Sequence, residues 1–143
     1  MPNPHTATTD NLEQALALVH GRPFEDAHPR RYAWAEPLRQ EISSAITDAA
    51  YELGHRRLMA GQWQAAERAI IIGITLEPGI ERLWRLLILA AHESHSPVRE
   101  QQAIDRLLVV TDQLGCDLEP ETERMLSALK DPSAGFDDLK EAL

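Results

Sequence analysis

Apolar side chains recur at helical spacing along most of the chain. The longest stripe follows the three- and four-residue steps that place side chains on one face of an α-helix. It consists of Leu38, Ile42, Ala45, Ile46, Ala49 and Leu53. No segment alternates apolar and polar positions with β-branched residues, as a half-buried strand would. The pattern therefore predicts an all-α protein.

Glycine and proline divide this apolar pattern into separate helices. Gly21, Pro78 and Gly115 end helices, because glycine closes a last turn and proline cannot continue one. Pro37 and Pro97 fit the first turn of a helix, where the missing N–H costs no hydrogen bond. The sequence predicts helices over about 10–20, 36–59 (or from 33), 64–76, 80–93, 97–114 and 121–129.

Two consecutive helix pairs repeat each other. Leu87 follows Leu53 by 34 positions (87 − 53), and Ala103 follows Ala66 by 37 positions (103 − 66). A period near 34 residues is typical of tetratricopeptide (TPR) helix pairs, which stack side by side and bury a continuous core. We therefore expect a TPR-like α-α superhelix of about six to seven helices.

Four further positions predict how these helices pack. Gly54 lies inside a helix despite a propensity cost of about 1 kcal/mol relative to alanine, which indicates close approach of a neighbouring helix. The second repeat has Ile88 at the equivalent position. We expect Trp63 and Trp84 to lie between helices as part of the core.

Length and composition indicate one domain with two short ends. A chain of 143 residues can bury a core without disulfides or metals. We expect residues 1–9 to form a flexible leader and residues 10–130 to form the helical domain. Residues 131–143 are rich in acids, Pro, Ser and Gly, and we expect an acidic tail that could form a short helix.

The acidic composition narrows the choice of partners. The chain has 23 acidic and 14 basic residues and a formal net charge of −9, which argues against direct nucleic-acid binding because such binding relies on Lys and Arg. No apolar run reaches the roughly 18 to 20 residues of a membrane helix, and the N-terminus lacks a signal-peptide pattern. The single cysteine, Cys116, cannot form an internal disulfide, which fits a reducing compartment. We expect a cytoplasmic protein without membrane insertion.

Several short motifs occur in an order that resembles a known family. They are Gly-Arg-Pro-Phe at 21–24, Trp-Ala-Glu at 34–36, Glu-Arg-Leu-Trp at 81–84, Leu-Gly at 114–115 and Asp-Leu-Glu-Pro-Glu-Thr at 117–122. Together they resemble the bacterial transcriptional activator domain (BTAD), a TPR-like helical domain of actinobacterial proteins. In that family the domain follows a winged helix in antibiotic regulatory proteins, or lies near the C-terminal end of larger proteins, some of which carry LysM modules.

The resemblance implies a non-enzymatic domain for regulation and protein interaction. Its role would be to mediate oligomerisation or signal coupling in a larger transcription regulator, with another protein or a second copy as partner. Residues 32–37 are more similar to the LysM-containing group, which implies the alternative of a scaffold domain in a cell-envelope protein without a role at DNA. No winged helix precedes Asp10 and no P-loop signature is present, so we expect a domain of a longer protein or a stand-alone relative.

The residues most suited to contact a partner lie near the start of the long helix and on the inner helices. We expect Tyr32, Trp34 and Arg39 to form one part of the contact surface, since Trp and Tyr are enriched where proteins bind each other. Arg57 and Arg85, on the first helix of each repeat, are the other candidates. A stacked superhelix offers its inner face to partners.

Other polar groups have plainer interpretations. His92 and His95 lack the H-E-x-x-H spacing of a zinc site, so we expect exposed polar residues there. The basic trio 55–57 is either an anion site or the solvent-exposed face of a helix, and the basic pair 30–31 is either a contact for acidic or phosphate groups or a solvated loop. We favour the second interpretation for both. Cys116 has no basic neighbour that would activate it, and we predict no catalytic, cofactor-binding or metal-binding residues.

Overall fold

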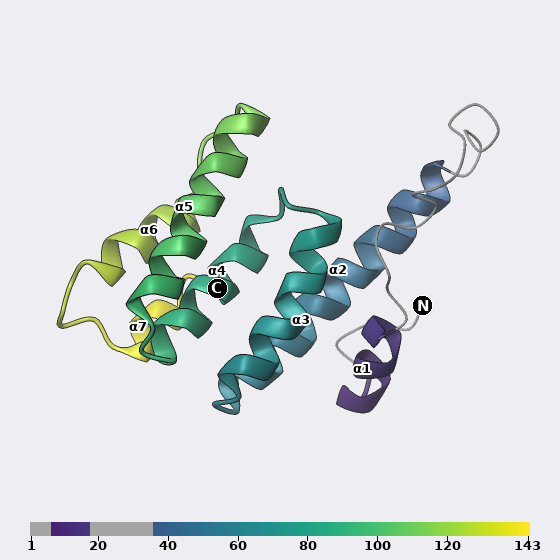
Figure 1. Cartoon of the computed structure of the whole chain (residues 1–143), viewed down its shortest axis with the longest axis horizontal. Helices are drawn as coiled ribbons and strands as arrows, with labels where there is room; N and C mark the ends of the chain where they lie inside the picture. Colours follow the sequence, from purple (N-terminus) through teal and green to yellow (C-terminus); the bar gives the residue numbers. More distant parts are fainter. Residues whose placement is uncertain (1–6, 18–35) are drawn as a thin grey trace.

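The structure is a computed structural model that describes residues 7–17 and 36–143. Seven α-helices and no strand are present in these residues (Figure 1). The helices are α1 (Thr9–Ala17), α2 (Glu36–Met59), α3 (Trp63–Leu76), α4 (Glu81–Glu93), α5 (Pro97–Leu114), α6 (Pro120–Leu129) and α7 (Phe136–Lys140). None of these helices combines the length and the apolarity that crossing a membrane requires. The predicted all-α, TPR-like fold is confirmed.

The helix ends in the described residues follow the local signals closely. α3 ends just before Pro78, and α5 begins at Pro97. After α5, Gly115 adopts a left-handed conformation with φ of 66°, which a side chain would disfavour. The first helix begins one residue earlier than predicted, because the hydroxyl of Thr8 rather than the carboxylate of Asp10 accepts a first-turn N–H. The predicted end of that helix lies outside the described residues.

Helices α2 and α3 approach each other through small residues. A Cβ atom on Gly54 would lie 2.7 Å from Cγ1 of Ile70, so only glycine leaves room for the isoleucine. Similarly, a Cβ atom on Gly73 would lie 3.0 Å from Cβ of Ala50 and 2.9 Å from Cδ1 of Leu83. The close approach predicted from Gly54 is confirmed, and a second contact of the same kind occurs at Gly73.

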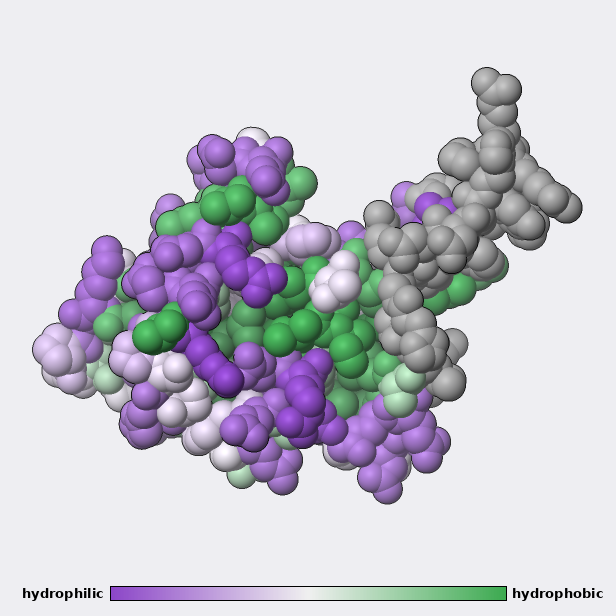
Figure 2. Space-filling model, in the orientation of Figure 1, coloured by the Kyte–Doolittle hydropathy of each residue, from purple (hydrophilic) through white to green (hydrophobic). Residues whose placement is uncertain are grey.

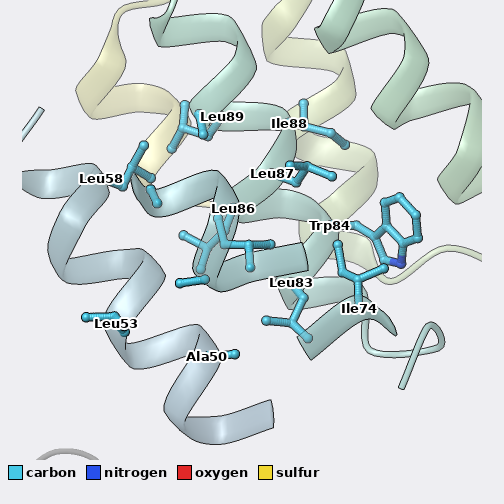
Figure 3. Packing of buried hydrophobic residues seen from close by; sticks show 14 of the residues in the cluster. Ala50, Leu53, Leu58, Ile74, Leu83, Trp84, Leu86, Leu87, Ile88 and Leu89 are labelled. Atoms are coloured by element: carbon cyan, nitrogen blue, oxygen red, sulfur yellow. The ribbon is translucent and has the colours of Figure 1, made fainter. Parts of the chain in front are cut away.

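Helix α4 lies at the centre of the fold and contacts α2, α3, α5 and α6. Its apolar side chains are buried on every side, including Leu83, Trp84, Leu86, Leu87, Ile88 and Leu89 (Figure 3). The indole N–H of Trp84 donates a hydrogen bond of 2.7 Å to the carbonyl oxygen of Pro78. A buried indole needs such a partner, so the turn before α4 fixes the ring in place. Trp84 is a core residue, as predicted, and Trp63 is half-buried against the core.

The C-terminal segment packs onto the rest of the domain. Leu139 on α7 is 1% exposed, and Ala142 after it is also buried in the hydrophobic core. The ring of Phe136 meets the ring of Trp63 edge to face, with the centroids 6.5 Å apart. Residues 131–143 contain α7, and its apolar face is buried. Burial of the apolar Leu139 side chain stabilises this segment against the domain, because it removes apolar surface from water.

Candidate interaction groove

A groove runs between α3 and α5, with α4 as its floor. Three hollows follow one another along it, with volumes of about 740, 140 and 430 Å³. The middle hollow shares Glu67 and Arg99 with the first and Arg106 with the third, so the three are continuous. The first turns of α3 and α5 line the first hollow, and their later turns line the third. We call this surface the α3–α5 groove.

The first hollow is the polar end of the groove. Its lining includes Gln62, Gln64, Glu67, Arg68, Ser94, Ser96 and Arg99. Nη1 of Arg99 on α5 donates a hydrogen bond of 3.1 Å to Oε2 of Glu67 on α3. This ion pair bridges the two helices. Arg68 makes no ion pair with any residue of the described ranges, and its side chain is exposed.

The third hollow is the apolar end. It is lined by Ile74, Thr75, Pro78, Trp84, Asp105, Arg106, Val109 and Val110. The guanidinium carbon of Arg106 lies 5.6 Å from the centroid of the Trp84 ring, a cation–π distance. Val109 is 55% exposed, and Ile71 in the middle hollow is also exposed. Figure 2 shows hydrophobic surface over α3 and toward the C-terminal end of α5, bordered by hydrophilic side chains.

A second polar group of residues lies in the interior, where α6 meets α4. Oε2 of Glu81 accepts hydrogen bonds from the N–H of Glu119 (2.8 Å) and the hydroxyl of Thr122 (2.7 Å). The same hydroxyl accepts a bond of 3.0 Å from Nη1 of Arg85, which also lies 3.4 Å from Oε1 of Glu119. These four residues, which we call the α4–α6 polar cluster, join two of the motif stretches, 81–84 and 117–122. Glu81, Arg85 and Thr122 are buried, so the cluster connects helices rather than forming a surface.

Comparison with known protein families supplies the identification. Residues 3–130 match the family described as the bacterial transcriptional activator domain, which is most of the chain. The chain belongs to this family. Comparison of the chain with curated proteins and with solved structures found no match. The resemblance carried by the short motifs is therefore confirmed, and a role in regulation of transcription is consistent with the family's description.

The structure places the predicted contact residues of this BTAD at separate points. Tyr32 and Trp34 lie outside the described residues, and Arg39 is half-buried on α2. Arg57 forms an ion pair with Glu13 of α1 and donates a bond of 2.9 Å to the carbonyl oxygen of Ala65. Its role within the described chain is to hold α1 and the start of α3 against α2.

Arg85 lies deeper than a contact residue usually does. It is 5% exposed and belongs to the α4–α6 polar cluster. None of Arg39, Arg57 and Arg85 lines any of the three hollows of the α3–α5 groove. The groove lies between the second helices of the two repeats, whereas these three arginines lie on the first helices.

One sequence signal could have indicated the groove. Residues 107–110 of α5 are Leu-Leu-Val-Val, a run that covers more than one face of a helix. Leu107 is buried, so Val109 must point elsewhere, and the structure leaves it exposed. An apolar residue off the core-facing stripe is a simple indicator of a second contact face.

Among the remaining candidates, His92 and Cys116 have partners inside the chain. Nδ1 of His92 lies 2.9 Å from Oε2 of Glu100, which links the end of α4 to the start of α5. His95 sits in the turn between these helices with φ of 57°. In the described ranges no group of three His, Cys, Asp or Glu side chains has the geometry to hold a metal ion. Cys116 is exposed, and its Sγ is 3.8 Å from the carbonyl oxygen of Thr111.

Proposed function

We propose that this BTAD is a non-enzymatic interaction domain of a cytoplasmic transcription regulator, in which it mediates oligomerisation or signal coupling. The observation that supports this most directly is the α3–α5 groove. It exposes apolar side chains, among them Ile71 and Val109, along a continuous hollow between two helices. Exposed apolar surface bordered by polar residues is typical of protein contact sites.

The charge of the chain favours a protein partner over nucleic acid. Binding to DNA gains most of its free energy from Lys and Arg that replace counterions at phosphates. With a net charge of −9, the isolated domain would repel a duplex. In this proposal another part of the regulator contacts DNA, while the BTAD contacts protein.

The oligomerisation part is tested by light scattering after size-exclusion chromatography over a wide range of concentration. We expect the mass to rise toward that of a dimer, because two copies of one surface form closed symmetric pairs. The variant Val109→Glu should remain monomeric, since it buries a charge in the contact. A constant monomer mass for the wild type would contradict oligomerisation by this domain.

Signal coupling is tested in the parent regulator with a promoter-reporter assay. A regulator that carries Val109→Glu should be expressed normally but should activate the reporter less than the wild type does. Val98→Glu, a change of another exposed valine on α5 outside the groove, serves as the control. Equal activation by the wild type and by Val109→Glu would contradict coupling through the groove. Binding of duplex DNA by the isolated domain at physiological salt would contradict the charge argument.

A further inference from the structure

We propose that the α3–α5 groove binds an extended segment of a partner protein that carries one large apolar side chain and, a few residues away, one or more carboxylates. The apolar side chain occupies the hollow beside Trp84, and the carboxylates lie against Arg68 and Arg99. This inference rests on the proposed function only in taking the groove as an interaction site. It specifies which chemical groups the partner presents to the groove.

The apolar end provides an anchor pocket. Its volume of about 430 Å³ is within the range of small-ligand sites, and Ile74, Trp84 and Val109 are among its lining residues. The Trp84 ring is held by its hydrogen bond to Pro78, so the pocket wall is rigid before a partner binds. A rigid, apolar pocket favours a large apolar side chain, because the pocket loses little entropy when it is filled.

The charge of the groove differs from the charge of the chain. Its charged lining residues are Arg68, Arg99, Arg106, Glu67 and Asp105, which gives +1 (three basic minus two acidic) in a chain with a net charge of −9. Within the groove, the excess of arginine therefore favours a partner segment that carries carboxylates.

The arginines are concentrated where a carboxylate could reach them. The side chain of Arg99 is 56% exposed and gives one N–H to Glu67, while its guanidinium group has five N–H donors. Arg68 is exposed beside it in the same hollow. The N-termini of α3 and α5 lie at this end as well and add their partial positive charge. The polar end thus favours carboxylates over amides.

The shape of the groove indicates an extended segment. The middle hollow, at about 140 Å³, is the smallest of the three and admits single side chains, so a segment that reaches both ends must follow the groove along its length. From Arg99 to Val109 the helix rises by roughly 15 Å at 1.5 Å per residue. An extended chain covers this distance in about four to five residues at 3.3 Å each. The apolar residue and the nearest carboxylate should therefore be about four positions apart.

A random peptide library displayed on phage, panned against the immobilised full chain, tests this proposal. We expect the enriched sequences to combine a large apolar residue with Asp or Glu about four positions away. The most enriched peptide is then synthesised with a fluorescent label, and its affinity is measured by anisotropy. Failure to enrich any sequence, or enrichment of basic sequences, would overturn the proposal.

Matched variants show where the peptide binds. We expect Val109→Glu and Arg99→Glu each to weaken binding about tenfold or more. The controls are Val98→Glu, whose valine is 67% exposed, and Arg124→Glu on α6, whose side chain is 66% exposed; both should bind within about twofold of the wild type. All four substitutions are at exposed positions, and circular dichroism checks that the variants are folded. Equal affinity of the groove variants and the controls would overturn the proposal.

Peptide binding and the proposed function can fail independently of each other. Peptide affinity is measured on the isolated domain and does not depend on oligomerisation or transcription. Peptide binding by a strictly monomeric domain would support the inference and contradict the oligomer. A dimer that the selected peptide fails to dissociate would show that the second copy binds outside the groove. The matched variants would still assign the peptide to the groove.

Discussion

Helices α2 and α3 meet through glycine and alanine, whereas α4 and α6 meet through charged and hydroxyl side chains. In the first interface, Gly54 and Gly73 let Ile70 and Ala50 approach without polar contacts. In the second, the buried carboxylate of Glu81 accepts two hydrogen bonds from the α6 side. One interface depends on shape and the other on the pairing of polar groups.

This difference predicts two kinds of response to mutation. A close-packed apolar interface loses stability when an atom is added, because the interior has no free volume. A buried polar cluster loses stability when an atom is removed, because each unpaired donor or acceptor retains its desolvation cost. The α2–α3 interface should therefore not tolerate an added side chain at its glycines, and the α4–α6 polar cluster should not tolerate the loss of a hydrogen-bonding group.

The largest effect is expected for Gly73→Val. The new side chain would overlap Cβ of Ala50, which is fixed to the α2 backbone and cannot rotate away. We expect a loss of about 3 kcal/mol in the free energy of unfolding, measured by urea denaturation. Gly79→Val is the control, since its Cβ would contact only the end of the exposed Leu114 side chain at 3.1 Å. Equal losses for the two variants would show that α2 and α3 are not closely packed.

The next effect in size is expected for Glu81→Ala. This change leaves the N–H of Glu119 and the hydroxyl of Thr122 without their acceptor, and we expect a loss of about 2 kcal/mol. Hydrogen exchange should become faster in α6 while α3 remains protected. Glu121→Ala, which removes only an exposed ion pair with Arg124, should cost less than about 0.5 kcal/mol. Uniformly faster exchange across all helices would contradict a local role of the cluster.

Thr122→Val should have a smaller effect, of about 1 to 2 kcal/mol. Its hydroxyl both donates to Glu81 and accepts from Arg85, so its removal interrupts the cluster at the centre. Combined with Glu81→Ala, the losses should be less than additive, since both changes break the same bond. Thr75→Val on α3, where the hydroxyl is exposed, is the control. Strictly additive losses would show that Glu81 and Thr122 act independently.

The smallest effect concerns Tyr51, a half-buried residue of α2. Burial raises the pKa of its phenol, and the charge of Arg82 partly opposes this. The folded state thus favours the neutral phenol. The contribution of this group to the free energy of unfolding is fully present below the unfolded pKa of about 10, and it is lost as the pH rises above that value.

Tyr51→Phe tests this effect. Its loss at neutral pH should be below about 0.5 kcal/mol, because the bond from the hydroxyl to the main-chain oxygen of Leu143 is long at 3.4 Å. Between neutral and alkaline pH, urea denaturation should show a steeper loss of stability for the wild type than for Tyr51→Phe. Parallel pH profiles of the two proteins would contradict the raised pKa.

Much of the fold could be predicted because its signals are local. Helix ends depend on neighbours in the sequence, so Pro97 and Gly115 mark the limits of α5. Gly54 predicted a close helix contact because a glycine inside a helix is costly without one. The position of the candidate site has only one local signal, the Leu-Leu-Val-Val run at 107–110. Arginine is a residue type that often contacts partners, yet Arg85 donates a hydrogen bond to Thr122 in the interior.

The sequence by itself determined the helices, their repeat near 34 residues and the family, since each depends on spacing along the chain. Only the tertiary structure decided which polar residues pair and which apolar faces stay uncovered. Glu81 meets Thr122 across 41 positions, and the α3–α5 groove joins helices that do not follow one another. Contacts of this range depend on how the helices stack, and no local pattern records that arrangement.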